Sequence, residues 1–217
     1  KTSILDFTPR TEFLDDFSMT LGTETVTGDT VSTGKYSTGK TTYVATVTDG
    51  DTDGGSTQTI VKGGAGNSVF PSGGNRCTAF VTDDKDDDSI ELQSIGDPFS
   101  VTDDTEFYME TRFKVDDVTT TDLIIGLASV HTTVIDGVDD GIYFTIAAGA
   151  GTVTAVVEKN TNPTPSATLH TLVNDTFVTL GLYKSAGNGT VKLYLNGEAT
   201  AVTLAMTNLP DDVEIVP

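Results

Sequence analysis

Three aspartates at alternate positions, followed by a glycine, have the spacing closest to a known binding chemistry. Asp49, Asp51 and Asp53 precede Gly54, which matches the first half of a calcium loop, with oxygen ligands at alternate positions and a glycine at the turn. The second half does not match, because Ile60 stands where a bidentate glutamate belongs. Aspartate and glycine also favour turns. The incomplete spacing therefore favours a solvated hairpin turn, with a calcium site as the alternative.

Other residues capable of site chemistry stand apart from one another. The run 83–88 is dense in carboxylates but lacks the ordered spacing of a metal loop, so we interpret it as a solvated loop. His131 and His170 have no partners at the spacing of a zinc site or a catalytic triad, and we expect each on the surface or on an edge strand. Cys77 is the only cysteine in the sequence, so it forms no intrachain disulfide, and we interpret it as a small buried hydrophobic residue.

The charge balance excludes whole classes of partner. The 217 residues hold 12 Lys and Arg against 32 Asp and Glu, a formal net charge of -20. Phosphate backbones and anionic membrane surfaces repel a protein this acidic. No apolar run approaches the ~20 residues that a membrane-spanning helix needs. We therefore predict no nucleic-acid partner and no membrane partner.

The stretch that positions the rest of the chain runs from 107 to 127. Apolar and polar side chains alternate over 107–115, which is the period of a strand with one buried and one solvated face. The run 122–127 is nearly all apolar, as in a strand covered on both sides, and Gly126 within it indicates a close approach to a neighbouring backbone. A sheet with one apolar face needs a second sheet over it, so the pair predicts a two-layer antiparallel β-sandwich. On the buried face of the first strand we expect Phe107, Met109, Thr111, Phe113 and Val115.

Short strands separated by turn signals continue along the chain and predict an all-β fold. Asn196-Gly197 is the strongest hairpin signal, and two prolines exclude 160–165 from any central strand. We interpret 21–42 as long loops around short edge strands, 1–20 as an extended N-terminal arm, and 21–217 as a single sandwich domain. Further strands are expected at 43–47, 58–61, 77–81, 89–92, 141–146, 152–159, 168–172, 177–184, 190–195 and 198–204.

The last residues have the pattern of one more strand. Residues 213–217 begin an apolar run at which the sequence stops. A sandwich that ended on an opening strand would expose an unpaired edge. We therefore predict that the natural chain extends past Pro217, or that another chain covers this edge.

The strand spacing in the second half of the chain is similar to that of a known family. Segments 107–115, 177–183 and 191–197 together resemble the concanavalin A-like jelly roll of laminin G domains, lectins and glucanases, and 14–17 is similar to the first strand of many members. There is also a narrower resemblance, to a lectin-like domain of structural proteins from tailed bacteriophages. Together the two resemblances cover about half of the chain. The narrower resemblance rests on 112–115, 125–128 and 136–144.

This resemblance implies a component of the virion surface. It implies a capsid decoration (cement) protein that binds the major capsid protein or other virion proteins, with the sandwich facing outward and the arm 1–20 docking on the capsid or on a neighbouring copy. Symmetric surroundings favour a homo-oligomer, for which we expect a trimer. The alternative is a carbohydrate-binding, lectin-like module of a tail fibre or adhesin.

The family also contains glycosidases, but the residues argue against that activity. Glucanase members carry Glu-x-Asp-x-x-Glu on one strand, which sets two carboxylates on one solvated face for hydrolysis. That motif is absent here: Glu106 and Glu110 come closest, with Tyr108 between them. We therefore predict a non-enzymatic protein without a cofactor, apart from the calcium alternative given above.

The tyrosines are interpreted as packing residues rather than as a sugar site. A sugar site usually presents aromatic side chains that stack on the sugar. The sequence contains no Trp, and its tyrosines lie in or beside predicted strands. We expect core or sheet-face positions for Tyr36, Tyr43, Tyr143 and Tyr194.

Chelation tests the calcium alternative. A Ca²⁺ ion bound by Asp49, Asp51 and Asp53 would relieve repulsion between the carboxylates and would stabilise the folded chain by mass action, so excess EGTA would lower the Tm. The favoured hairpin turn predicts instead that melting followed by circular dichroism is the same with and without EGTA. Asp51→Asn is the control variant, because loss of a calcium ligand would remove any EGTA effect.

Overall fold

The computed structural model describes residues 99–131, 134, 137–147, 149–187 and 190–217, together with strands between residues 24 and 95. The described residues form fifteen β-strands and contain no α-helix. The predicted all-β fold is therefore confirmed.

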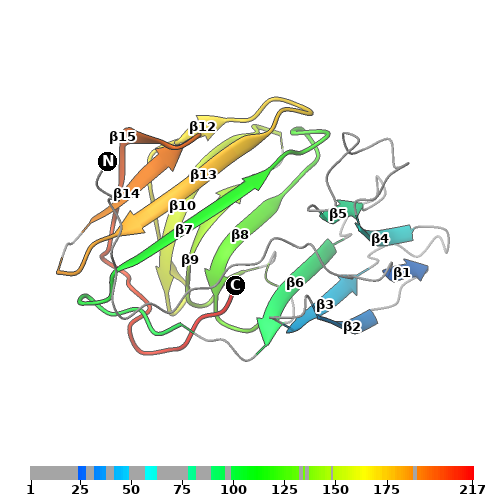
Figure 1. The fold of residues 1–217 in the computed structure, drawn as a ribbon, viewed down its shortest axis with the longest axis horizontal. Helices are drawn as coiled ribbons and strands as arrows, with labels where there is room; N and C mark the ends of the chain where they lie inside the picture. Colours follow the sequence, from blue (N-terminus) through cyan, green and yellow to red (C-terminus); the bar gives the residue numbers. More distant parts are fainter. Residues whose placement is uncertain are drawn as a thin grey trace, which may run out of the picture.

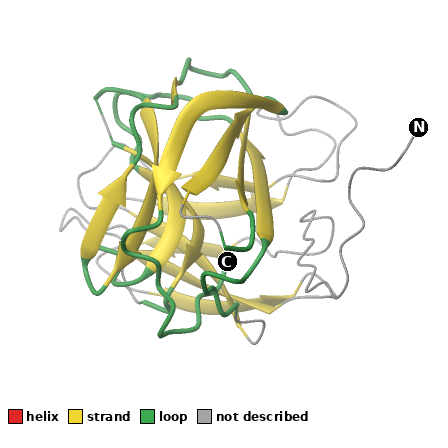
Figure 2. Cartoon of the chain, turned by 90° about the vertical axis from the view of Figure 1, so that its left-hand side faces the viewer, coloured by secondary structure: helices red, strands yellow, loops and turns green. Residues whose placement is uncertain are grey.

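Two antiparallel sheets lie face to face (Figures 1 and 2). One sheet has the order β11-β10-β9-β8, with β12 also paired to β10, and the other has the order β15-β14-β13-β7. The antiparallel sandwich is thus as predicted, whereas the jelly-roll assignment stays a prediction. The first sheet comprises β8 (Leu123–Ala128), β9 (Gly141–Ile146), β10 (Thr152–Lys159), β11 (Asn162–Pro165) and β12 (His170–Thr171). The second comprises β7 (Phe107–Phe113), β13 (Val178–Lys184), β14 (Thr190–Leu195) and β15 (Glu198–Ala205).

The core lies between these two sheets and follows the alternation of the sequence. Side-chain burial alternates along β7 as predicted, with Phe107, Met109 and Phe113 packed against the core. From the opposite sheet, Ile142 and Phe144 are fully buried in the same core. Burying an aliphatic or aromatic side chain of this size stabilises the fold by roughly 1.5–3 kcal/mol. The apolar face of each sheet therefore holds the other in place.

Lys184 is a charged residue on this inward face. It follows the buried residues Leu180 and Leu182 at the end of β13, and its side chain is fully buried. Its Nζ donates hydrogen bonds to the backbone oxygens of Asp103, at 2.6 Å, and Thr105, at 2.8 Å. Burial lowers the pKa of the Lys184 ammonium, while the carboxylates of Asp103 and Asp104 oppose that shift. The lysine thus fixes the turn before β7 to the end of β13.

Strand β8 is covered on both sides, as its apolar sequence predicts. Leu127 lies in the main core, whereas Ala128 packs on the outer face in a second buried cluster with Tyr143 and Val156. A Cβ on Gly126 would lie 2.5 Å from both the Cα of Tyr143 and the backbone oxygen of Ile142. The predicted close approach at Gly126 is therefore confirmed, since the absent side chain makes room for Tyr143.

Two tight turns join neighbouring strands of the sandwich. Asn196 and Gly197 have φ values of 52° and 83° and connect β14 to β15, which confirms the predicted hairpin. A second hairpin, through Asn160 and Thr161 at φ 51° and 61°, connects β10 to β11. The expected loop at 160–165 thus contains the short strand β11, but at the edge of its sheet, so the exclusion of its prolines from a central strand is confirmed.

The strands before residue 99 form two further three-stranded sheets, beside the sandwich in Figure 1. Their orders are β1-β4-β5 and β2-β3-β6, so the first two strands are edge strands, as expected. The strands predicted at 77–81 and 89–92 exist but lie in different sheets. The bounds are β1 (Glu24–Thr27), β2 (Ser32–Ser37), β3 (Thr42–Thr48), β4 (Thr57–Lys62), β5 (Thr78–Val81) and β6 (Ser89–Ile95).

Several predictions fall outside the described residues. They concern the arm 1–20, the aspartates Asp49, Asp51 and Asp53, the acidic run 83–88, and Cys77. Each stays a prediction, as does the single domain 21–217.

The premise of an unpaired edge at residues 213–217 is wrong for Ile215 and Val216, whereas the extension of the natural chain past Pro217 and the cover by another chain stay predictions. Ile215 pairs with Phe99, and Val216 pairs with Ala128 at the end of β8. The backbone N–H of Ser94 in β6 donates to the backbone oxygen of Pro217 at 2.7 Å. The physical reason is that Ile215 and Val216, both buried, satisfy their backbone groups within this chain.

Gly126→Ala tests the close approach of β8 to β9. We expect a loss of about 1–3 kcal/mol in the free energy of unfolding, because the new Cβ meets backbone atoms that cannot move without parting the strands. Urea denaturation measures the loss. Gly137→Ala is the matched control, with nothing within 4 Å of the added carbon, and should change stability by no more than about 0.5 kcal/mol. Equal effects of the two substitutions would contradict the packing described for Gly126.

Candidate functional site

Three tyrosines come together on the outer face of the sheet β15-β14-β13-β7. Tyr108 in β7 lies directly opposite Tyr183 in β13. Tyr194 in β14 lies opposite Gly181, which is the neighbouring outward-facing position of Tyr183 on β13. Their side chains point away from the core because the alternate residues of the same strands are buried in it. Tyr108 is 51% exposed, while Tyr183 and Tyr194 are half-buried. We call these three residues the tyrosine face.

Gly181 makes the packing of this face possible. A Cβ at Gly181 would lie 3.2 Å from the phenol oxygen of Tyr108 and 3.3 Å from the Cβ of Tyr194. The ring of Tyr108 therefore reaches across a position where β13 has no side chain. Tyr108 and Tyr194 meet edge to face, with ring centroids 6.3 Å apart and planes at 81°. Such a pair is a favourable arrangement of aromatic quadrupoles, and it fixes the orientation of both rings.

Two carboxylates hold the phenols of the tyrosine face. Tyr108 donates its phenol hydrogen to Oε2 of Glu110 at 2.5 Å, and Tyr183 donates to Oε1 of Glu106. Partial burial, followed by the hydrogen bond to Glu110, raises the pKa of Tyr108. The hydrogen bond to Glu106 is the main cause of the raised pKa of Tyr183. Both phenols thus stay protonated well above neutral pH and remain hydrogen-bond donors.

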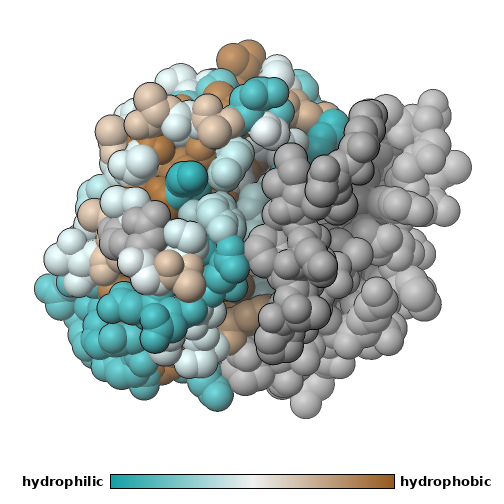
Figure 3. Space-filling model, turned by 60° about the vertical axis from the view of Figure 1, so that its left-hand side comes forward, coloured by the Kyte–Doolittle hydropathy of each residue, from teal (hydrophilic) through white to brown (hydrophobic). Residues whose placement is uncertain are grey.

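Cationic residues also lie on this outer face. The guanidinium of Arg112 stacks on the ring of Phe177, with its central carbon 4.0 Å from the ring centroid. Lys192 in β14 is exposed and lies opposite Tyr183. Figure 3 shows hydrophobic and hydrophilic residues side by side on the upper part of the described surface and a continuous hydrophilic patch at its lower left. The tyrosine face is therefore an aromatic and acidic cluster with a lysine at its border.

A second tyrosine–glutamate pair is buried on the opposite side of the sandwich. Tyr143 in β9 donates to Oε2 of Glu158 in β10 at 2.5 Å, and both residues are only 6% exposed. Burial raises the pKa of Glu158, and the charges of Asp139 and Asp140 raise it further, against the effect of the hydrogen bond from Tyr143. Because it is closed to solvent, we assign this pair a structural role.

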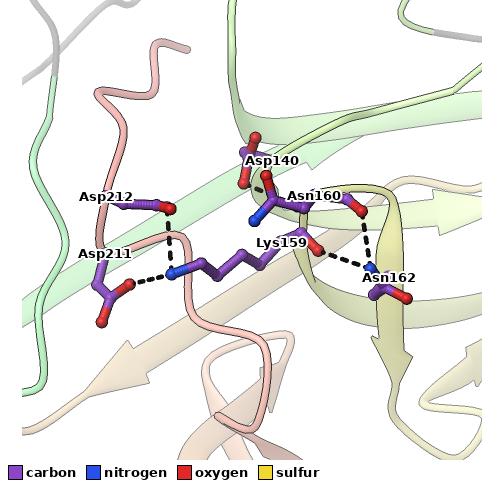
Figure 4. A network of polar contacts seen from close by, with 6 residues as sticks. All are labelled: Asp140, Lys159, Asn160, Asn162, Asp211 and Asp212. Atoms are coloured by element: carbon purple, nitrogen blue, oxygen red, sulfur yellow. Dashed lines mark hydrogen bonds and ion pairs between the residues drawn. The ribbon is translucent and has the colours of Figure 1, made fainter.

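A third polar cluster fixes the turn between β10 and β11 (Figure 4). Lys159 forms ion pairs with Asp211, at 2.5 Å, and with Asp212, at 3.3 Å. The backbone N–H of Asn160 donates to Oδ1 of Asp140, and the side-chain amide of Asn162 donates to the backbone oxygen of Asn160. The ion pairs of Lys159 and the bond from Asn160 to Asp140 tie this turn to distant parts of the chain, so we assign this cluster a structural role as well.

The positions of the expected site residues bear on these assignments. His170 lies on the short strand β12 and His131 in a loop, both half-buried, in agreement with the edge and surface positions expected for them. Tyr143 and Tyr194 occupy the predicted core and sheet-face positions. Within the described ranges no group of three or more His, Cys, Asp or Glu residues is arranged to hold a metal ion.

Local sequence patterns encode only part of the tyrosine face. The alternation of β7 places Tyr108 and Glu110 together on a solvated face, and this part can be predicted from the sequence of 107–115 alone. Tyr183 and Tyr194 join them only through the registers of two strand pairs, and no local pattern encodes those registers.

Fold and site together define an antiparallel β-sandwich protein with an aromatic, acidic outer face. Comparison with family models, with curated proteins and with solved structures finds no match to this chain. No helix among the described residues has the length and apolar character needed to cross a bilayer. The concanavalin A-like assignment therefore stays a prediction from the sequence.

The buried Glu158 predicts a pH dependence of stability. The pKa of Glu158 in the folded chain is raised above its ordinary value of 4.5, so the folded chain keeps a proton that the unfolded chain has lost. The contribution of this proton to the free energy of unfolding is fully present below pH 4.5, and it is lost as pH rises through the raised pKa of the folded chain. Each pKa unit by which the folded value exceeds the ordinary value contributes about 1.4 kcal/mol to the free energy of unfolding that is lost in this way.

Glu158→Gln should remove this loss, so that the variant gains stability relative to the parent chain as pH rises. Urea denaturation at a series of pH values measures the difference. Glu198→Gln, at an exposed position, controls for the loss of one charge. A difference between Glu158→Gln and the parent that does not vary with pH would contradict the raised pKa.

Proposed function

We propose that this chain is a non-enzymatic structural protein of a bacteriophage virion, a capsid decoration protein that binds the major capsid protein and lies on the capsid surface as a homo-oligomer, with a trimer as the expected form. The resemblance of its second half to lectin-like domains of phage structural proteins supports the proposal. The acidic composition supports it further, because a net charge of -20 keeps a many-copy surface protein soluble.

The observation that carries the proposal is the way in which the tyrosine face uses its carboxylates. Glu106 and Glu110 are the pair closest to a glycosidase arrangement in the sequence, and each accepts a hydrogen bond from a tyrosine. Those bonds stiffen an exposed aromatic surface, whereas a retaining glycosidase needs one carboxylate free as nucleophile and the other as acid. A rigid surface of this kind is suited to binding a partner without reacting with it.

A carbohydrate-binding module of a tail fibre or adhesin is the second candidate. The observation that favours it is the exposed ring of Tyr108 beside Tyr194, since aromatic side chains with a polar tip stack on sugars and hydrogen-bond to them.

Immunogold labelling of virions tests the proposal. Antibodies raised against the purified chain are applied to intact particles of a phage that encodes it, and the particles are imaged by negative stain. We expect label distributed over the head in a repeating pattern. A virion with this gene deleted is the control. Label confined to tail fibres would favour the carbohydrate-binding candidate, and intact virions without label would overturn both assignments.

A further inference from the structure

The tyrosine face has an electrostatic character that specifies its partner. Neither Glu106 nor Glu110 forms an ion pair with any residue in the described part of the chain. Both carboxylates instead accept phenol hydrogens, and a phenol that donates to an anion has a more electron-rich ring. The negative faces of such rings attract cations, and two adjacent carboxylates strengthen that attraction.

The geometry leaves aromatic surface free to receive a cation. Tyr108 and Tyr194 meet edge to face, with their planes at 81°, so their contact covers one face of one ring and leaves both faces of the other ring uncovered by its partner. Tyr108 keeps 51% of its surface exposed although its phenol is fixed. The same sheet face already carries a cation on a ring, where Arg112 stacks on Phe177 at 4.0 Å. The tyrosine face offers the same interaction to a group from outside.

We propose that Tyr108, Tyr183 and Tyr194, with Glu106 and Glu110, bind lysine or arginine side chains of a partner protein. The inference deepens the proposed function and rests on it for the partner's identity as a virion protein. It states the chemistry of contact: a basic surface segment inserts cationic side chains between aromatic rings and carboxylates.

Charge complementarity selects this partner over two other occupants. A second copy of this chain would bring another net charge of -20 against the same carboxylates. A neutral sugar would stack on the rings but would gain nothing from the charges of Glu106 and Glu110. Two cations of this chain oppose the binding of a further cation: Arg112, the outward residue that follows Glu110 on β7, and exposed Lys192, opposite Tyr183. Because Arg112 stacks on Phe177, Lys192 supplies the variant with the opposite expected sign.

The test uses the full chain labelled with ¹³C-tyrosine and two blocked peptides, one with four lysines and one with the same lysines acetylated. Binding is followed by NMR, with ring signals assigned through Tyr→Phe variants. We expect the lysine peptide to shift the signals of Tyr108, Tyr183 and Tyr194 and to leave buried Tyr143 unchanged. The acetylated peptide, which keeps the apolar stem and loses the charge, should produce no shift.

Three variants separate the sources of affinity. Tyr108→Leu, which keeps an apolar side chain without a ring, should weaken binding of the lysine peptide about twofold to fivefold, the range of an exposed cation–π contact. Glu110→Gln should weaken binding, whereas Lys192→Gln should strengthen it, because they change the local charge in opposite directions. Circular dichroism of each variant confirms that the fold is kept.

Three results would overturn the inference: equal binding of the two peptides, unchanged affinity in Tyr108→Leu, or shifts of the three tyrosines by maltohexaose but not by the lysine peptide. The last would identify a carbohydrate surface. Because these measurements use the purified chain and no virion, their failure leaves the labelling of particles unaffected. Unlabelled virions would equally leave the cation-binding chemistry standing.

Discussion

The constraint on which this structure depends is that each main sheet has one face that must be kept from water. The buried side chains of β7 and β13 meet those of β9 and β10, and neither sheet is stable with that face exposed. This mutual burial fixes which residues point inward. It therefore also fixes which residues remain on the two outer faces, where the two groups of tyrosines and glutamates described above lie.

The two outer faces carry the same chemical pair in different surroundings. On one side, Tyr143 is buried in a cluster with Ala128 and Val156, and its hydrogen-bond partner Glu158 is buried as well. There the carboxylate is desolvated, and its pKa is raised. On the other side, Tyr108 and Glu110 stay in contact with solvent. The same type of hydrogen bond therefore belongs to the buried packing on one outer face and to a solvent-exposed surface on the other.

Much of this fold follows from local sequence patterns, whereas the candidate site does not. Alternation at 107–115, the turn at Asn196-Gly197 and the small residue at Gly126 each carry their structural meaning within a few residues, and each is confirmed. Lys184 shows the limit of such patterns: period-2 alternation puts a charged residue inward, and only the distant turn at Asp103 and Thr105 supplies its hydrogen-bond partners. The tyrosine face depends on strand registers in the same non-local way. The pairing of Ile215 with Phe99 is also invisible to any short window of sequence.

The short strand β11 has a consequence for crowded assemblies. Pro163 and Pro165 are exposed, stand two residues apart and lie at the edge of their sheet. Backbone amides alternate in direction along a strand, so both proline nitrogens face the same way and remove two successive donors from a single side. A strand from a neighbouring molecule approaching that side would find an interrupted template. This edge therefore resists intermolecular strand pairing, and with it aggregation into fibrils, even where many copies are held at high local density.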